Sequence, residues 1–93
     1  MEVKHQTTET GGSFYYEENG HKLAEMTYTM AGAQRMIIDH TEVDASLQGK
    51  GVGKVLLAEL VNYVRAHKIT MIPLCPFAKA TFKRTPEWGD VLI

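Results

Sequence analysis

The chain contains little of what disulfide-bonded, metal-binding or membrane-spanning proteins need. Cys75 is the single cysteine among 93 residues, so no disulfide can form within the chain, and a lone thiol is typical of the reducing cytoplasm. The four histidines are far apart in sequence and lack the spacing of zinc ligands. No apolar run approaches the roughly 20 residues of a membrane helix, and the N-terminal residues are polar. We therefore expect a cytoplasmic protein without a metal site.

Charged residues are unevenly divided along the chain. They make up 23% of the sequence, against 44% hydrophobic residues, which is ordinary for one soluble domain. Residues 1–48 hold three basic and eight acidic side chains, whereas residues 49–93 hold seven basic and three acidic ones. The basic half suits a phosphate-rich ligand, and the acidic half suits a cationic acceptor. No dense run of lysine and arginine occurs, which disfavours a nucleic-acid partner.

The first half of the chain predicts antiparallel strands. Asn19-Gly20 is a strong signal for a two-residue hairpin turn. Residues 22–30 alternate between apolar and polar side chains, which indicates a half-buried strand. Aromatic content, alternation and turn signals together predict a meander of strands at residues 13–17, 22–30 and 35–43. Residues 1–12 end in Thr10-Gly11-Gly12 and are expected to be a loose leader, with at most a short strand near Val3.

The second half of the chain predicts a βαβ unit followed by a short helix. Residues 52–67 carry apolar side chains at spacings of three and four, which predicts a helix with one core-facing stripe. Residues 69–74 are almost wholly apolar, as in a buried strand parallel to residues 36–43. We further expect a helix from residue 77 to 83 or 84 and a terminal edge strand over 88–93. The predicted fold is an α+β mixed sheet in a single domain, residues 1–93.

A glycine-rich turn, Gln48-Gly49-Lys50-Gly51-Val52-Gly53-Lys54, joins the strand at 35–43 to the following helix. The first backbone N–H groups of a helix lack partners, and the helix dipole adds positive potential there. Glycine allows positive φ and the close approach of a ligand, and Lys50 and Lys54 add charge. The turn therefore predicts a site for a phosphate or a diphosphate. Its alternative is a plain connection between strand and helix.

Three phosphate-binding patterns compete for this turn. The P-loop pattern fails at its first glycine, which is Gln48, and at its hydroxyl position, which is Val55. The missing hydroxyl also disfavours a nucleotide bound together with a metal. The dinucleotide pattern fails at its third glycine, which is Lys54, and the chain is short for two mononucleotide-binding halves. The pattern Gln/Arg-x-x-Gly-x-Gly/Ala is met fully by Gln48, Gly51 and Gly53.

This last pattern resembles the diphosphate loop of the GNAT superfamily of N-acetyltransferases. The likeness covers nearly all of the chain from Phe14 onward, in the order meander, strand, glycine turn, helix, strand with cysteine, and short helix. More narrowly, the chain resembles the small YjdJ-type family, which is a minimal form without the usual N-terminal helices. The stretches that carry the likeness are 23–28, 39–43, 48–53, 73–79 and Trp88.

The resemblance implies a protein that binds acetyl-CoA without a metal and acetylates an unidentified amine, either a small amine or a protein lysine. GNAT folds thread the pantetheine arm between two splayed strands, which implies backbone contacts at Val43 and places Cys75 near the sulfur of CoA. The resemblance further implies that the seven residues of the turn bind the diphosphate: Gln48, Gly49, Lys50, Gly51, Val52, Gly53 and Lys54. Phe77 to Lys79 would line the thioester or pantetheine end, and an outer phosphate would meet Lys79, Lys83 or Arg84.

Candidates for the acetyl-transfer chemistry are Cys75, His40 and Glu42. His40 and Glu42 share one face of their strand, so either is a candidate base, with a hydrogen-bonded structural pair as the alternative. Cys75 is a candidate nucleophile because a helix N-terminus stabilises a thiolate; its alternative is a buried apolar role. Many GNAT enzymes use a tyrosine acid in the helix after the splayed strand, but here no tyrosine follows Tyr63.

Two functional classes remain, an acetyltransferase and a non-catalytic module that binds CoA or acetyl-CoA. Both predict CoA binding, and the enzyme alone predicts release of CoA that depends on an amine. The helices absent from this chain ordinarily form much of the acceptor wall. We therefore expect an acceptor site that is open, shallow or completed by a partner.

Overall fold

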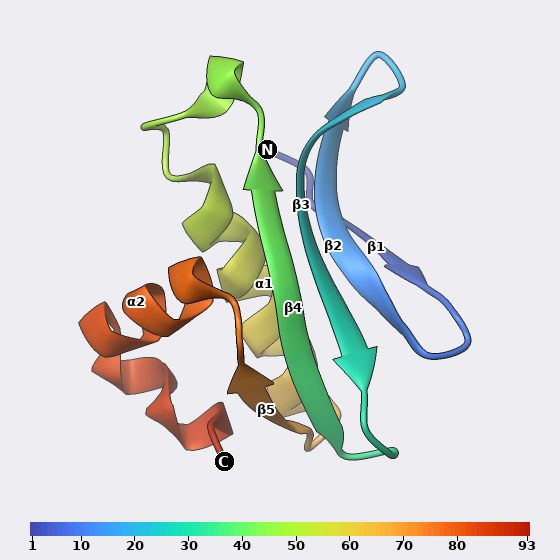
Figure 1. Cartoon of the computed structure of the whole chain (residues 1–93), viewed down its shortest axis with the longest axis vertical. Coiled ribbons are helices and arrows are strands. Elements are labelled where there is room, and N and C mark those ends of the chain that lie inside the picture. Colours follow the sequence, from blue (N-terminus) through green and yellow to red (C-terminus); the bar gives the residue numbers. More distant parts are fainter.

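The computed structural model describes residues 1–93 and contains one five-stranded sheet with two α-helices (Figure 1). The strands lie in the order β1-β2-β3-β4-β5. Their bounds are Lys4–Thr7, Gly11–Glu18, His21–Met30, Arg35–Val43 and Thr70–Pro73. Strands β1 to β4 pair antiparallel, and β5 pairs with β4 in parallel. The expected mixed sheet, a meander followed by a βαβ unit, is confirmed.

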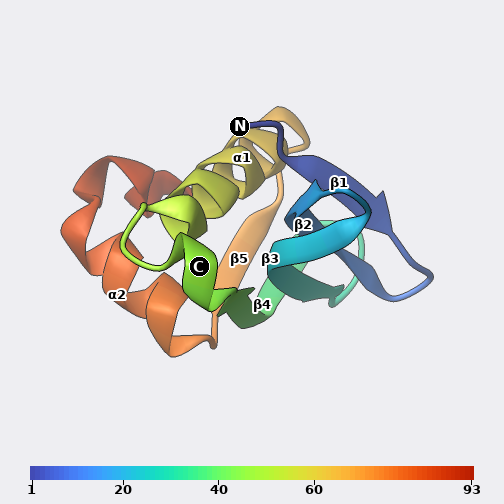
Figure 2. The ribbon, with the colours of Figure 1, turned by 90° about the horizontal axis from the view of Figure 1, so that it is seen from above.

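The helices lie on one side of the sheet. Helix α1 (Val52–Ala66) crosses one face of the sheet, α2 (Pro76–Arg84) follows β5, and no helix covers the opposite face (Figure 2). Two short 3-10 helices complete the chain, η1 (Ala45–Leu47) and η2 (Pro86–Val91). No helix has both the length and the apolar character that a membrane crossing requires. The bare face of the sheet is called the uncovered face below.

The local sequence explains the β2–β3 hairpin and its orientation. Asn19 and Gly20 both have positive φ, 51° and 79°, which is the signature of a type I′ turn. The side chains of β3 that lie beneath α1 alternate as predicted, at Ala24, Met26 and Tyr28. The hydrophobic pattern of β3 and its turn therefore agree on the same register.

Helix α1 supplies one side of the core. Every residue of its predicted stripe is fully buried: Leu56, Leu57, Leu60, Val61 and Val64. They belong to one 18-residue hydrophobic cluster with side chains of β2, β3, β4, β5 and α2. Burying such a side chain contributes roughly 1.5–3 kcal/mol. The stripe is accordingly structural, and it fixes the N-terminus of α1 next to the end of β4.

Strands β4 and β5 separate where β5 ends. The amides of Leu74 and Cys75 both donate to the carbonyl oxygen of Ile38, at 3.1 and 3.3 Å. Beyond this point the chain turns into α2, whereas β4 continues to Val43 without a partner on that side. The paired segments are residues 35–38 and 70–73. The unpaired edge of β4 over residues 39–43 is called the β4 notch below.

A bulge in β4 decides which side chains face the helices. Thr27 pairs with His40 but Tyr28 pairs with Ile38, so Asp39 is an extra residue in β4. After the bulge, Thr41 lies opposite the buried Met26 and faces the helices. His40 and the residue two positions later, Glu42, face the uncovered side because successive side chains alternate.

Two expectations about the chain ends need correction. Residues 1–12 are not a loose leader throughout: the short strand considered near Val3 is present as β1, which pairs with β2, and residues 11–12 begin β2. A Cβ on Gly11 would collide with the carbonyl of Tyr28, and one on Gly12 with the carbonyl of Gln6, so these glycines allow close strand contact. At the other end, residues 86–91 form η2 in place of an edge strand, and a single bridge joins Leu92 to Met71.

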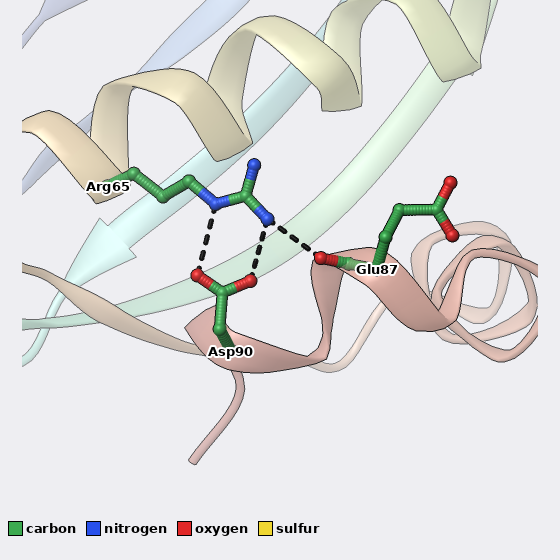
Figure 3. Close-up of polar contacts among 3 residues, drawn as sticks. All are labelled: Arg65, Glu87 and Asp90. Atoms are coloured by element: carbon green, nitrogen blue, oxygen red, sulfur yellow. Dashed lines mark hydrogen bonds and ion pairs between the residues drawn. The ribbon is translucent and has the colours of Figure 1, made fainter.

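An ion pair fastens η2 to α1. Arg65 donates from Nε and Nη2 to the two carboxylate oxygens of Asp90, at 3.1 and 2.6 Å, and from Nη2 to the carbonyl of Glu87 at 2.8 Å (Figure 3). The bidentate geometry fixes the orientation of η2 as well as its distance from α1. Because a proline opens η2 and this clamp holds it, the C-terminal segment folds as a helical turn rather than a strand.

Candidate functional site

A cleft of about 470 Å³ lies between the end of β4, the glycine turn, the start of α1 and α2. Its lining runs from Thr41 and Val43 in the β4 notch, past the turn, to Arg84 and Thr85 at the end of α2. The residues between these ends are Leu47, Gln48, Gly49, Gly51, Val52, Gly53, Lys54, Phe77 and Thr81. Eight of the eleven predicted ligand-binding residues therefore lie on one cleft: Val43, Gln48, Gly49, Gly51, Val52, Gly53, Lys54 and Phe77.

The turn holds its shape through local hydrogen bonds. Asp44 caps η1 by accepting from the backbone N–H and the hydroxyl of Ser46, at 2.9 and 2.6 Å, and both bonds lower the pKa of Asp44. Gly49 and Gly51 have φ of 79° and 72°, a region that glycine enters without strain. Gly51 is also the N-cap of α1 and provides no side-chain cap. The N-terminus of α1 is thus left open toward the cleft.

Five backbone amides in the turn have no protein acceptor. Those of Val52, Gly53 and Lys54 belong to the first turn of α1, where no carbonyl four residues earlier is in reach. The amides of Gly49 and Gly51 are also unbonded within the chain. All five residues line the cleft. A group of N–H donors at the positive end of a 15-residue helix, beside the ammonium group of Lys54, is suited to an anion such as a diphosphate.

The side chain of Gln48 is hydrogen-bonded to strand β4 and not to the glycine turn. Its Nε2 donates to the carbonyl oxygen of Val43 at 3.1 Å. The N–H of Asp44 donates to Leu23 on β3, so the backbone groups of Val43 point to the other edge, into the β4 notch. With its carbonyl taken by Gln48, Val43 has its N–H free along this edge. Gln48 was predicted to bind the diphosphate, and its side chain is hydrogen-bonded to Val43.

Cys75 lies directly behind the cleft wall. It is 4% exposed and is the N-cap of α2, and its Sγ donates to Oγ1 of Thr41 at 3.3 Å. Thr41 lines the cleft and Cys75 does not. The thiol is therefore one side chain away from the β4 notch. Lys50 and Lys79, also predicted to bind the ligand, are exposed and lie outside the lining.

His40 and Glu42 are not in the cleft. His40 lines a separate shallow hollow of about 490 Å³ on the uncovered face, together with Thr27, Asp39, Leu74 and Pro76. Glu42 borders another hollow, of about 200 Å³, on the same face. Neither side chain has a hydrogen-bond partner within the protein, so they do not form the structural pair considered above. Because side chains alternate along β4 after the bulge at Asp39, these two side chains lie on the opposite face of the sheet from Thr41.

The sequence reasoning missed four residues that line the cleft: Thr41, Leu47, Thr81 and Thr85. Thr41 could have been found because it lies two positions before Val43 and therefore on the same face of a strand. Thr81 follows Phe77 by one helical turn and bonds to its carbonyl at 2.9 Å. Thr85 is 2% exposed, and its hydroxyl has no partner within the protein. Leu47 carried no signal, because it belongs to the short helix η1 that the sequence did not predict.

The structure contains no cluster of three or more histidine, cysteine, aspartate or glutamate side chains arranged to hold a metal ion. The groups that line the cleft are backbone amides, hydroxyl groups and cationic side chains, and one thiol lies next to its wall.

Comparison with known proteins agrees with this geometry. A family model described as GCN5-related N-acetyl-transferase matches residues 13–91. The solution structure of a GCN5-like N-acetyltransferase candidate from Staphylococcus aureus superposes with a TM-score of 0.75 at 33% identity, over 97% of this chain and 87% of that one. No match is found among curated proteins compared by sequence.

Two longer enzymes share the fold. These are a ribosomal-protein-alanine N-acetyltransferase from Brucella melitensis, with a TM-score of 0.69 at 14% identity, and the ribosomal-protein-S18-alanine N-acetyltransferase from Escherichia coli, with 0.68 at 18%. The matches cover 84% of this chain in both cases, but only 62% and 53% of the two enzymes. At these identities they establish the fold alone. The family match and the Staphylococcus aureus relative decide the assignment: the chain belongs to the GCN5-related N-acetyltransferase family.

Proposed function

We propose that the cleft binds acetyl-CoA and that the protein transfers the acetyl group to an amine in the cytoplasm. The observation that carries the proposal is the group of five unpaired amides at Gly49, Gly51, Val52, Gly53 and Lys54, which face a single cleft. The donors match the several acceptor oxygens of a diphosphate, and the positive end of α1 favours its charge. The narrower YjdJ-type assignment stays a prediction.

The β4 notch supports the proposed direction of the ligand. With the diphosphate at the start of α1, an extended arm can lie along the unpaired edge of β4, as an additional strand would, and accept a hydrogen bond from the N–H of Val43. Phe77 adds an apolar wall on the side of α2. The arm then ends at Thr41, behind which lies Cys75. The acyl end of the ligand is thus assigned to the neighbourhood of the thiol.

Cys75 is our candidate for the residue that receives the acetyl group. Its thiolate would form a bond to the acetyl carbon while the bond to the sulfur of CoA breaks and CoA leaves as a thiolate. The amine nitrogen would next attack the same carbon, displace the sulfur of Cys75 and lose one proton to a base. The contact between Sγ and Thr41 supports this assignment because it holds the sulfur against the cleft wall.

The amine is proposed to reach this point from the uncovered face. Leu74 and Pro76, the neighbours of Cys75 in sequence, line the hollow that contains His40. Cys75 therefore lies between the cleft and this hollow. His40 is the proposed base, directly or through a water molecule, and Glu42 lies on the same face to favour a cationic acceptor. An open hollow on a bare sheet agrees with the expected shallow acceptor site.

One observation favours the alternative of a binding module without turnover. No histidine, aspartate or glutamate lines the cleft itself, so the ligand-binding side of the β4 notch offers no general base. Release of CoA thiol from acetyl-CoA, followed against polyamines, amino acids and lysine peptides, separates the two functions. The enzyme gives release that depends on the amine, whereas a module binds acetyl-CoA and gives none.

The roles of Cys75 and His40 are tested in the same assay. Mass spectrometry after incubation with acetyl-CoA should detect one acetyl group on Cys75, and Cys75→Ala should lose both the acetyl group and amine-dependent release. His40→Gln should lower release with little effect on CoA affinity, whereas His21→Gln, at the exposed end of β3, serves as the matched control. Full activity in Cys75→Ala would rule out the acyl-cysteine route and leave direct attack by the amine.

A further inference from the structure

The single tryptophan of the chain, Trp88, stands in η2 with its ring held in place. Its indole meets the ring of Phe82 edge-on, with ring centroids 6.1 Å apart, and its backbone N–H donates to the carbonyl of Thr85 at 3.0 Å. The clamp between Arg65 and Asp90 fastens the same helical turn to α1 (Figure 3). Trp88 is half-buried, so this ring is neither a full member of the core nor freely mobile.

The ring of Trp88 is linked to the cleft by one side chain. Lys54 lines the cleft and contributes one of the five unpaired amides, and its ammonium nitrogen lies over the indole at 5.9 Å from the ring centroid. Lys54 is exposed and has no ion-pair partner in the protein. A cation–π contact at an exposed site is weak. Trp88 does not itself line the cleft, and what lies over its ring is the end of the flexible Lys54 side chain, which a planar group can displace.

The cleft also carries a second cation at this end. Arg84 is in the last turn of α2 and lines the cleft together with Thr85, which bonds to the backbone of Trp88. The opposite end of the lining is the β4 notch with Thr41 and Val43. A ligand that has its diphosphate at the start of α1 and its thioester arm in the notch must direct its nucleotide the other way, past Lys54.

We propose that the indole of Trp88 is the stacking surface for the adenine base of CoA, which rests on the proposed function above. Lys54 then leaves the ring and turns toward the diphosphate, and Arg84 faces the phosphate on the ribose. Stacking suits this place because an aromatic side chain held by Phe82 and by the fastened η2 turn offers its π-face at little entropic cost, and every purine has a matching face. The proposal assigns a role to η2, which takes no part in the proposed binding of the diphosphate, the arm and the acyl group.

Trp88 supplies its own probe, since no other tryptophan contributes to the fluorescence of the protein. Titration of the intact chain with CoA or with adenosine 3′,5′-bisphosphate should quench and shift the emission of Trp88. The same titration with 4′-phosphopantetheine, which has the arm but lacks the adenine, should change the emission much less, because its phosphate can draw Lys54 from the ring but it places no base there. Equal changes with all three ligands would overturn the assignment of the base to this ring.

Substitution gives a second measurement that does not depend on fluorescence. By calorimetry, Trp88→Leu should weaken CoA about tenfold, in line with the usual contribution of one stacked base, and leave 4′-phosphopantetheine affinity unchanged. Trp88→Tyr, which keeps an aromatic face, should recover most of the loss. A general effect on folding would weaken both ligands alike, and the unchanged affinity for 4′-phosphopantetheine excludes it.

The outcomes separate this proposal from the proposed function. If CoA binds to Trp88→Leu as tightly as to the native chain and does not alter the emission of Trp88, the stacking proposal is wrong and the cleft remains a CoA site. If CoA produces neither heat nor a change in emission with the native chain, both proposals are wrong. A selective loss of adenine-containing ligands in Trp88→Leu, with recovery in Trp88→Tyr, supports the stacking proposal.

Discussion

Gly53 and Phe77 touch across the cleft: a Cβ placed on Gly53 would lie 2.6 Å from Cζ of the Phe77 ring. This contact joins the first turn of α1 to the first turn of α2 and so sets the distance between two walls of the cleft. The last glycine of the motif is therefore required by a neighbouring side chain. Gly51, in contrast, has open space around it and is required for its positive φ.

Gly53→Ala should destabilise the protein. Overpacking of this kind costs about 1–3 kcal/mol, which exceeds the gain of at most about 1 kcal/mol from replacing glycine in a helix. In a Phe77→Ala background the clash is gone, so the same substitution should become neutral or stabilising. Gly89→Ala is the matched control, because Gly89 has an ordinary φ and open space around it. Chemical denaturation of Gly53→Ala, Phe77→Ala, the double variant and Gly89→Ala measures the change in the free energy of unfolding. If Gly53→Ala destabilises the protein equally with and without Phe77, the contact is contradicted.

Lys54→Glu should weaken CoA by about tenfold, equivalent to roughly 1.4 kcal/mol, because Lys54 lines the cleft. Lys50→Glu should have a smaller effect, since Lys50 is exposed and lies outside the lining. Lys68→Glu, beyond the far end of α1, makes the same change of net charge away from the site. Calorimetry at two salt concentrations tests this order of CoA affinities, and the differences in affinity between the variants should shrink at high salt. Three equal effects would indicate a response to net charge alone.

The stability of the sheet should fall as the pH drops below about 6.5. His5 of β1 stacks on Phe14 with ring centroids 4.0 Å apart, and its Nε2 lies 2.6 Å from the hydroxyl of Tyr28. Burial first, and the charge of His67 second, lower the pKa of His5 from the ordinary value of 6.5. Near and below that value the unfolded chain binds more protons than the folded one, so the free energy of unfolding decreases as the pH falls.

The variant His5→Phe isolates this effect. It keeps the stack on Phe14 and the edge contact to Tyr63 but does not titrate, so its stability should change less between pH 7.5 and 5 than that of the native chain. His21→Phe, at the exposed start of β3, is the control. Thermal denaturation across this pH range provides the comparison. An identical pH profile for the native chain and His5→Phe would show that His5 is not the group responsible.

Loss of the clamp should free Trp88 without unfolding the sheet. Arg65→Ala removes both bonds to Asp90 and the bond to the Glu87 carbonyl. We expect greater access of a soluble quencher to Trp88 and weaker binding of CoA, with 4′-phosphopantetheine unaffected. The charge swap of Arg65→Asp with Asp90→Arg tests whether opposite charges suffice to hold η2. Unchanged quenching in Arg65→Ala would mean that contacts with Phe82 alone position the ring.

The order of elements could be predicted because local signals and tertiary structure agree. The Asn19-Gly20 turn follows from the positive φ that these two residues favour. The alternation along residues 22–30 and the apolar stripe of α1 follow from periods of two and about four residues, which the fold keeps. The glycine turn could be proposed as an anion site from the sequence because its position between a strand and a helix was also predictable. Its donors are backbone groups, whose place is set by the strand-to-helix order.

What the sequence did not reveal depends on contacts between distant residues. The bulge at Asp39 places His40 and Glu42 on the uncovered face and Thr41 in the cleft, and a period of two along the strand has no signal for an extra residue. Gly11 and Gly12 were interpreted as flexible, whereas they permit close contact with β1 and β3. The clamp of Arg65 on Asp90 joins residues 25 positions apart. It holds residues 86–91 as η2, in a segment where an edge strand was expected.

The most direct test of the account is an amide NMR titration of the isotope-labelled chain with CoA. We expect a joint shift, saturating at one concentration, of the N–H resonances of Gly49, Gly51, Val52, Gly53 and Lys54, with a further shift at Val43. The Lys54→Glu variant should require more CoA to reach the same shifts. Saturable shifts confined to other residues, or no shifts on addition of CoA, would contradict the claim that these free amides form the diphosphate site.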